Sequence, residues 1–416
     1  MPQQIHFILN SFETVTTEPA GRLVLDFLRH DRRLIGTKEG CKEGDCGACV
    51  VLVGELAGDR VEYKPVTSCL MPIGELHGKH LVTIEGLNRE KLTPVQQAIV
   101  DEGGSQCGFC TPGIVVSLTG YLLQPRASFD DEGIKYALGG NLCRCTGYAS
   151  LMRAGRKLIK QFDNNSANGR KRVNSLQALT KQGLLPNYFL TIAQRLRMLP
   201  ALDVKNGKGT PDCIVAGGTD IYVQRGDELP DGKIVALNLH PEMKGIAIRD
   251  GRVQVGALTT FEEFAVHPMI NKIIPDMRQY NLLNASWQIR NRATLGGNIV
   301  NASPIGDMTA LLLALESDVI LQEGEKRRTV PLKSFFKGYK VLEKKPTEIL
   351  SEIVFPWPDN RTKIHFEKVS KRKTLDIASV NSGIKVRSEK GVILDIQLSM
   401  GGVAPIPLFM KKTCDF

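Results

Sequence analysis

The stretch Gly36-Thr-Lys-Glu-Gly-Cys-Lys-Glu-Gly-Asp-Cys-Gly-Ala-Cys49 holds three cysteines in the order C-x4-C-x2-C, and Cys69 follows it. This order is the plant-type spacing for the four ligands of a 2Fe-2S cluster. Gly40, Gly44 and Gly47 suit a loop whose backbone N–H groups surround buried sulfur charge. A zinc knuckle and unrelated buried cysteines are the alternatives, and the spacing favours the iron–sulfur site.

A second group of cysteines reads Cys107-x2-Cys110 and closes with Cys143-x-Cys145. A tetrahedral zinc site could have the same spacing, so this group alone leaves zinc open. Thr93-Pro94 and Thr111-Pro112 each predict a capping residue followed by proline at the first helical position. We therefore expect the first two cysteines of this group between two helices, where a helix dipole favours thiolate.

The residues around the second group resemble a known family. Gln106-Cys-Gly-Phe-Cys-Thr-Pro-Gly113 and Asn141-Leu-Cys-Arg-Cys-Thr-Gly-Tyr148, placed after the first group, are similar to the two-cluster portion of the molybdenum hydroxylases. That family includes xanthine dehydrogenase, aldehyde oxidase, and the carbon monoxide and aromatic acyl-CoA dehydrogenases. The resemblance implies one 2Fe-2S cluster on each set of four cysteines, which are Cys41, Cys46, Cys49 and Cys69 in the first set and Cys107, Cys110, Cys143 and Cys145 in the second.

Composition bounds the class of protein. The 416 residues suggest about three domains, each long enough to bury a core. The first thirty residues lack the pattern of a secretory signal and no apolar run approaches membrane-spanning length, so we expect a cytoplasmic, soluble protein. The formal charge is +10, but the basic residues are dispersed and aromatics make up only 6%. This pattern disfavours nucleic acid and suits anionic cofactors and partners.

We predict a multidomain α+β protein with four parts and a linker. These are a β-grasp, ferredoxin-like 2Fe-2S domain (1–86), a helical-bundle 2Fe-2S domain (87–162), a polar linker (163–175), a two-subdomain α/β FAD-binding domain (176–358) and a C-terminal α+β flavoprotein subdomain (359–416). The linker is assigned because its composition cannot bury a core. The short basic run Arg170-Lys-Arg172 within it is a weak nuclear-localisation or nucleic-acid signal.

Two glycine pairs predict a dinucleotide site. Cys213-Ile-Val-Ala216 reads as a strand that leads into Gly217-Gly-Thr-Asp220, and glycines after a strand let backbone N–H groups approach a pyrophosphate. A second pair lies within Thr294-Leu-Gly-Gly-Asn298. Neither has the GxGxxG form, which disfavours a Rossmann NAD site. Resemblance to the family's FAD domain implies FAD contacts from Ile214, Val215, Ala216, Gly217, Gly218, Thr219, Asp220, Thr294, Leu295, Gly296, Gly297, Asn298, Asp307 and Leu350.

The last part of the chain resembles the family's C-terminal flavoprotein portion. Ser370-Lys-Arg-Lys-Thr-Leu-Asp-Ile-Ala-Ser379 is similar to a loop that overhangs the flavin, and an exposed basic connection between strands is the alternative. Glu367 stands where some relatives carry a lysine near the flavin. The chain stops at Phe416, earlier than the resemblance leads us to expect, so we expect this subdomain to be incomplete.

The order iron–sulfur, iron–sulfur, FAD resembles the small subunit of two-subunit bacterial xanthine dehydrogenases. That resemblance implies an electron-transfer subunit with two 2Fe-2S clusters and FAD, and NAD+ as acceptor. The helical-domain cluster would then face a large molybdopterin-binding partner, in a heterodimer or a dimer of heterodimers. We expect no catalytic acid, base or nucleophile for the substrate in this chain. The alternatives are the same role with an aldehyde, acyl-CoA or N-heterocycle dehydrogenase, and a truncated metal-binding scaffold.

Overall fold

The structure, a computed structural model, describes residues 4–125, 129–163, 175–201, 213–237 and 240–416. The predicted linker therefore lies almost entirely outside the described residues, as does the basic run within it. The chain forms two compact units. Of the described residues, those up to 213 together with 222–234 and 286–289 form unit 1, and the others, namely 214–221, those between 235 and 285, and 290–416, form unit 2.

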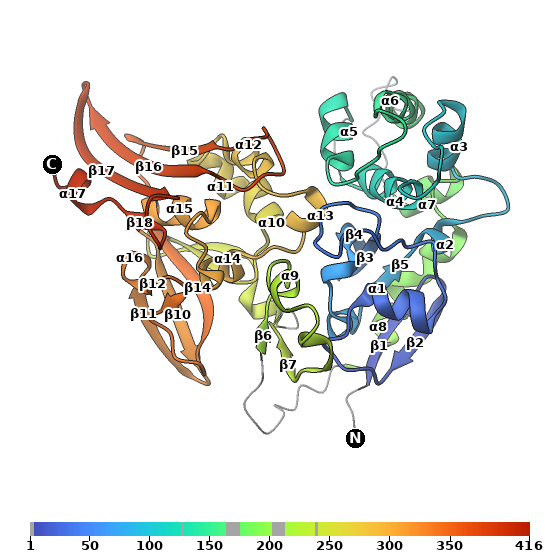
Figure 1. Cartoon of the computed structure of the whole chain (residues 1–416), viewed down its shortest axis with the longest axis horizontal. Helices are drawn as coiled ribbons and strands as arrows, with labels where there is room; N and C mark the ends of the chain where they lie inside the picture. The colour runs from blue at the N-terminus through green and yellow to red at the C-terminus, as the bar shows by residue number, and fades with distance from the viewer. Residues whose placement is uncertain (1–3, 126–128, 164–174, 202–212, 238–239) are drawn as a thin grey trace. The chain divides into compact units, whose positions relative to one another are not determined.

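Unit 1 contains a five-stranded mixed sheet in the order β2-β1-β5-β3-β4. Its strands are β1 (Ile5–Leu9), β2 (Phe12–Thr16), β3 (Val50–Ala57), β4 (Arg60–Thr67) and β5 (His80–Val82). The β1–β5 pair is parallel and the other neighbours are antiparallel. This arrangement confirms the predicted β-grasp sheet (Figure 1).

Nearly continuous apolar runs along the strands bury both faces of this sheet. Phe7 and Val51 pack in a core with the helical turns α1 (Val24–Asp26) and η1 (Phe27–Asp31). Ile8 and Leu52, one residue further along each strand, pack in a second core with α4 (Thr111–Leu122). Because successive side chains point to opposite faces, one sheet contributes to a separate core on each side.

Four helices of unit 1 pack on the second face, where Figure 1 shows α3, α4, α5 and α6 together. Their bounds are α3 (Pro94–Asp101), α4 (Thr111–Leu122), α5 (Asp131–Leu138) and α6 (Ala149–Asp163). Thr93 caps α3 through a capping box, as predicted. The predicted cap at Thr111 is wrong, because Cys110 is the N-cap of α4 and the Thr111 hydroxyl bonds Ser105 at 2.7 Å.

Two further helices complete unit 1. Helices α7 (Leu176–Lys181) and α8 (Ile192–Met198), with the 3-10 turn η5 (Asn187–Thr191), lie within the range predicted for the FAD-binding domain. Their apolar residues, Leu179 and Phe189 among them, nevertheless pack in the core shared by α4 and the sheet. The shorter elements are η2 (Ser68–Leu70), η3 (Ile73–Leu76), α2 (Ile84–Leu87), α9 (Ile221–Arg225) and η6 (Leu229–Asp231).

Unit 2 is built on a five-stranded antiparallel sheet in the order β11-β10-β14-β9-β8. Its strands are β8 (Ile246–Arg249), β9 (Arg252–Gly256), β10 (Asp318–Glu323), β11 (Lys326–Pro331) and β14 (Ile349–Pro356). The helices and turns of this part are η8 (Pro241–Met243), α10 (Phe261–Val266), α11 (Pro268–Ile273), α12 (Met277–Leu282), α14 (Leu295–Asn301), α15 (Asp307–Ala314) and α16 (Leu332–Phe335). Most of the apolar helical residues share one core with the sheet.

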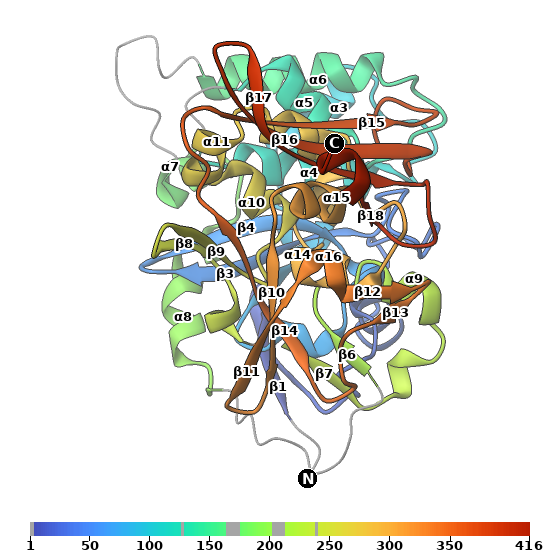
Figure 2. The same cartoon turned by 90° about the vertical axis from the view of Figure 1, so that its left-hand side faces the viewer.

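A second antiparallel sheet closes unit 2 in the order β15-β16-β17-β18. It consists of β15 (Thr362–Val369), β16 (Val380–Glu389), β17 (Val392–Gly401) and β18 (Leu408–Phe409), followed by α17 (Lys411–Cys414). Helix α15 lies against β16 and β17 (Figure 2). Two short ladders remain, β12 (Phe336–Gly338) with β13 (Val341–Leu342), and β6 (Cys213–Val215) with β7 (Ile234–Ala236). The predicted multidomain α+β class is confirmed.

Candidate cofactor sites

The first set of cysteines converges on the loop between η1 and β3. Cys41 and Cys46 hydrogen-bond through their side chains, and Cys49 does so with Cys69, which lies in η2. Cys41 also interacts electrostatically with both members of the second pair. Cys49 and Cys69 are buried, whereas Cys41 and Cys46 are partly exposed. The fold thus brings together four side chains that the sequence spreads over 29 residues, from 41 to 69.

The cluster loop stabilises thiolate charge with its own backbone. The pKa of Cys41 is lowered to about 4 by the hydrogen bond with Cys46 and by the N–H groups of Glu43, Cys46 and Asp45. Burial opposes this shift. The Glu43 nitrogen lies 3.3 Å from this sulfur. Donors directed at the sulfurs of an iron–sulfur site are one of the means by which a protein tunes the cluster's potential.

The second set lies between helices. Cys107 and Cys110 precede α4, and Cys143 and Cys145 occupy the loop between α5 and α6. The sulfurs of Cys107 and Cys145 are 3.8 Å apart, and Cys110 hydrogen-bonds Cys143. Burial raises the pKa of Cys110 to about 12, against the thiolate preference expected at the start of a helix. Desolvation outweighs the helix dipole there.

A hydroxyl group contacts the second set. The Thr146 Oγ1 lies 3.1 Å from the Cys143 Sγ. Burial opposes ionisation of this thiol, but hydrogen bonds from the Thr146 side chain and from the local backbone hold the pKa of Cys143 below its ordinary value. A thiolate can only accept this bond, so Thr146 is the donor whenever Cys143 is a ligand. Thr146 belongs to the motif Asn141–Tyr148, but the sequence alone did not indicate a role for it.

The sulfurs meet in pairs. Among the residues that the structure describes, no three His, Cys, Asp or Glu side chains gather closely enough to hold one metal ion. Each set consists instead of two sulfur pairs that lie near each other. Four cysteines ligate a 2Fe-2S cluster, and this leaves two for each iron. The paired arrangement therefore fits the donor set that such a cluster needs.

The two cluster loops are hydrogen-bonded to each other. The Leu142 N–H, next to Cys143, donates to the Cys46 carbonyl at 2.9 Å. Beside it the Asn141 Nδ2 donates to the Gly47 carbonyl at 3.1 Å. A side chain at Gly47 would lie 2.2 Å from the Gly140 carbonyl oxygen, so only glycine lets the loops approach this closely. One hydrogen bond thus joins the backbone of a ligand in one set to the backbone beside a ligand in the other.

The two glycine segments predicted to bind FAD also lie side by side, both within unit 2. The Arg292 guanidinium donates to the Gly217 carbonyl at 2.7 Å, and a Cβ at Gly297 would lie 3.8 Å from the Ala216 Cβ. Thr294 caps α14 by accepting from the Gly297 N–H at 3.1 Å. The predicted residues Ile214 and Val215 lie in β6, Ala216 to Asp220 follow it, and Leu295 to Asn298 lie in α14. A dinucleotide that contacts both segments needs this adjacency.

Asp307, a predicted FAD contact, forms an ion pair and a hydrogen bond inside the protein. It opens α15 and accepts from the Lys368 ammonium at 2.7 Å and from the Asn381 amide at 2.6 Å. Burial raises the pKa of Asp307, and these two partners oppose that shift. Glu367 itself is exposed, and alternation along β15 turns the next residue, Lys368, inward to 3% side-chain exposure.

Leu350 lies in β14, opposite Leu321 of β10, and is buried in the core of unit 2. Its contact with FAD stays a prediction.

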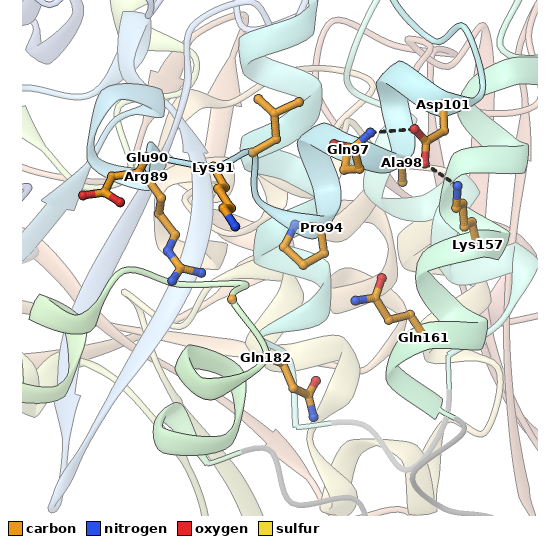
Figure 3. A pocket seen from close by; sticks show the side chains of 12 residues that line it. Arg89, Glu90, Lys91, Pro94, Gln97, Ala98, Asp101, Lys157, Gln161 and Gln182 are labelled. Carbon is orange, nitrogen blue, oxygen red and sulfur yellow. Dashed lines mark hydrogen bonds and ion pairs between the residues drawn. The ribbon is translucent and has the colours of Figure 1, made fainter.

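One cavity of about 570 Å³ lies in unit 1 beside α3 and α6 (Figure 3). Arg89, Lys91 and Asp101 line it, and Asp101 accepts from Gln97 at 2.6 Å and pairs with Lys157. Its lining residues are distinct from the predicted cofactor ligands. Because most of them are exposed, the cavity is an open surface hollow and not an enclosed ligand site.

Four family models match the chain, in the order that the motifs indicate. They are the 2Fe-2S iron-sulfur cluster binding domain (7–74), the 2Fe-2S binding domain (83–156), the FAD binding domain in molybdopterin dehydrogenase (195–358) and the CO dehydrogenase flavoprotein C-terminal domain (365–416). The xanthine dehydrogenase of Oryza sativa subsp. japonica is 30% identical over 472 residues, which cover 94% of this chain and 34% of that protein. The xanthine dehydrogenase/oxidase of Rattus norvegicus is 30% identical over 475 residues, which cover 99% of this chain and 35% of that protein. The chain is homologous to the iron–sulfur and flavin parts of the molybdenum hydroxylases.

This molybdenum hydroxylase homologue spans about a third of the length of the curated relatives it matches. It contains two 2Fe-2S domains and one FAD-binding domain. Among solved structures, the reconstituted CO dehydrogenase from Oligotropha carboxidovorans is 25% identical with a TM-score of 0.47, over 50% of this chain and 73% of that one. Among the described residues, no helix has the length and apolar character to cross a membrane. When bound, iron–sulfur clusters exchange single electrons and FAD exchanges one or two.

Proposed function

We propose that the chain is the electron-transfer subunit of a cytoplasmic xanthine dehydrogenase. In this role it passes electrons from a molybdenum centre on a partner subunit, through two 2Fe-2S clusters and FAD, to NAD+ during oxidation of hypoxanthine and xanthine. The observation that carries the proposal is the backbone hydrogen bond between the cluster loops, from Leu142 to Cys46 at 2.9 Å. It connects two one-electron sites within one unit, as a relay requires.

We assign the first cluster to the four cysteines from Cys41 to Cys69 and the second to those from Cys107 to Cys145. The paired sulfur contacts in each set support this assignment. We assign the FAD phosphates to the segments 214–220 and 294–298, supported by their adjacency. The ion pair of Asp307 with Lys368 supports a further role for Asp307, which is to fix the start of α15 beside Asn298, since Asn298 bonds Thr309 of that helix at 2.9 Å.

The partner subunit is proposed to dock where the second cluster reaches the surface. Cys107 and Cys145 are exposed in this chain. Phe109 and Leu142, each within two residues of a second-set cysteine, are large apolar side chains that are 47% and 58% exposed. An apolar surface around a redox group suits a buried contact with another protein, because docking removes that surface from water and shortens the path for electrons.

A different partner substrate is the second candidate. The match of residues 365–416 to the CO dehydrogenase flavoprotein C-terminal domain favours the same electron-transfer role in a molybdenum hydroxylase other than xanthine dehydrogenase. Aldehydes, aromatic acyl-CoA esters and N-heterocycles are the substrate classes in question. The substrate pocket would lie on the partner, so the residues described here place no constraint on it.

The test is to purify the chain with its molybdopterin-binding partner and to add substrates one at a time without air. Hypoxanthine or xanthine should bleach the visible absorbance of the clusters and flavin, and NAD+ should restore it with formation of NADH. Bleaching by an aldehyde, an acyl-CoA or another N-heterocycle but not by a purine would select the second candidate. Failure of every substrate class, in a complex that dithionite reduces fully, would contradict both.

A further inference from the structure

Gln288 is a fully buried amide that the cofactor assignments leave without a role. It lies in α13 (Trp287–Arg290), and residues 286–289 belong to unit 1 although the residues on either side belong to unit 2. Its side chain is 0% exposed. Glutamine is seldom buried to this degree, because each polar atom that leaves water needs a new partner.

The Gln288 amide nitrogen reaches three elements of unit 1. It donates to the Ser117 hydroxyl of α4 at 2.9 Å, to the Ala137 carbonyl of α5 at 3.1 Å, and to the Asn141 Oδ1 at 3.3 Å. Asn141 lies two residues before Cys143, and its own amide donates to the Gly47 carbonyl. A chain of hydrogen bonds therefore runs from α4 and α5 through Gln288 and Asn141 to the loop that holds Cys46 and Cys49.

The neighbours of Gln288 contact the same two loops. A Cβ at Gly44, in the first cluster loop, would lie 2.6 Å from the Ile289 Cδ1, and a Cβ at Gly140, in the second, would lie 2.5 Å from the Ser286 Cβ. The Trp287 and Tyr136 rings lie 5.1 Å apart, which fixes the segment on α5. The four residues 286–289 thus contact both cluster loops. Among the described residues, Gln288 supplies the hydrogen bond that connects this network to α4.

We propose that Gln288, acting through Asn141, is a positioning residue for electron transfer between the two clusters. It holds the loop of Cys143 and Cys145 at a fixed separation from the loop of Cys46 and Cys49. This inference rests on the proposed electron-transfer function. Electron transfer between two centres slows steeply as their separation grows, so a rigid amide at the junction keeps the relay fast. The amide nitrogen alone carries this positioning through its bonds to Ser117, Ala137 and Asn141, because the Gln288 Oε1 has no hydrogen-bond partner among the described residues.

The test uses the full chain with its clusters, reduced without air, and measures the magnetic dipolar coupling between the two reduced clusters by pulsed EPR. Gln288→Met removes the amide and keeps the length of the side chain. The matched control is Gln124→Met, because Gln124 donates from its side chain to the Tyr63 and Gly120 carbonyls at 3.2 and 3.1 Å. We expect Gln288→Met to keep both cluster signals but to shift and broaden the distribution of distances between them. Gln124→Met should give the wild-type distribution.

A second variant keeps the inference testable if Gln288→Met does not fold. Asn141→Ala removes the contacts with Gln288 and Gly47 but keeps the backbone bond from Leu142 to Cys46, and the same shift is expected. Wild-type distances in either folded variant would overturn the positioning role. Loss of iron from both variants, with Gln124→Met intact, would show a purely structural role and would overturn it too. A wild-type chain that binds no iron would contradict the proposed function itself. The iron content of the wild type is therefore measured before any variant is compared with it.

Discussion

At the scale of single residues, the Thr146 hydroxyl beside the Cys143 sulfur has a redox consequence. A hydrogen bond to a ligand sulfur stabilises the more negative, reduced cluster more than the oxidised one, and so raises the midpoint potential. We expect Thr146→Val to lower the midpoint of the second cluster by about 59 mV if the bond changes the reduction equilibrium tenfold. An EPR-monitored redox titration measures it. Thr146→Ser keeps the hydroxyl and should keep the midpoint; equal midpoints for valine and wild type would contradict the assignment.

His80 predicts a pH dependence of stability in unit 1. Its ring is buried between the Tyr63 hydroxyl and the Asn10 carbonyl, each at 2.8 Å. The carbonyl can only accept, so the Nε2 carries the proton and the Nδ1 accepts from Tyr63. Burial lowers the pKa of His80 from 6.5 to about 3. The neutral ring therefore favours the folded state fully above pH 6.5, and this contribution is lost as the pH falls from 6.5 toward 3.

The expected loss is about 1.4 kcal/mol per pH unit in that window, because the unfolded chain binds a proton that the folded chain excludes. Urea unfolding between pH 7 and pH 4 measures it. In His80→Gln this one contribution is absent, so its stability should fall less steeply with acidification than that of the wild type. Parallel pH profiles for the two proteins would contradict a neutral, buried His80.

The ion pair of Lys368 and Asp307 predicts a large energetic effect in unit 2. Its side chains are 3% and 9% exposed. Lys368→Met leaves a buried carboxylate without its cation, and we expect a loss of about 3–5 kcal/mol in unfolding free energy, reduced if Asp307 takes up a proton. Lys411→Met breaks an exposed pair with Asp415 and should cost no more than about 0.5 kcal/mol. Equal losses in the two variants, measured by urea unfolding, would show that Asp307 does not depend on Lys368.

At the scale of elements, the first cluster loop depends on glycine where it meets the second. Gly47 has a φ of +67°, and a Cβ there would lie 2.2 Å from the Gly140 carbonyl oxygen. Gly58, in the β3–β4 turn, has a φ of +61° and open space around it. Gly58→Ala should therefore cost about 1 kcal/mol, the penalty of the left-handed conformation alone.

Gly47→Ala adds the steric clash to the same backbone penalty. We expect it to destabilise unit 1 more than Gly58→Ala does, and to weaken iron retention by both sets of cysteines. Thermal unfolding and iron content after gel filtration measure the two effects. Similar behaviour of the two alanine variants would mean that the loops do not need their close approach.

Sequence reasoning located the elements that carry a strong local signal. The spacing of the cysteines and the short apolar runs of β1 and β3 are short-range patterns, and they predicted the ferredoxin-like sheet and both loops. Gln288 escaped prediction because its partner Asn141 is 147 residues away, and only the folded chain brings them together. The predicted cap at Thr111 was wrong because capping depends on the path of the backbone in the preceding loop. Here the Thr111 hydroxyl is hydrogen-bonded to the Ser105 hydroxyl and does not cap the helix.

At the scale of the whole molecule, four different domains, each matched by its own family model, follow one another in a single chain. The FAD-binding domain follows both cluster domains in the sequence, as FAD follows both clusters in the proposed relay. The two clusters themselves are in the opposite order, because the plant-type cluster comes first in the chain and is proposed as second in the relay. The formal charge of +10 suits a chain that binds the anionic FAD. The domain limits of 1–86, 87–162, 176–358 and 359–416 stay predictions.

The central claim is that this chain carries two 2Fe-2S clusters and one FAD as an electron relay. The most direct measurement is the content of iron, acid-labile sulfide, zinc and flavin in the chain purified without air, with spectra before and after dithionite. The account predicts about four iron, four sulfide and one FAD per chain, with absorbance that bleaches on reduction. Zinc in place of iron, in a folded chain without flavin, would contradict the relay and leave a metal-binding scaffold.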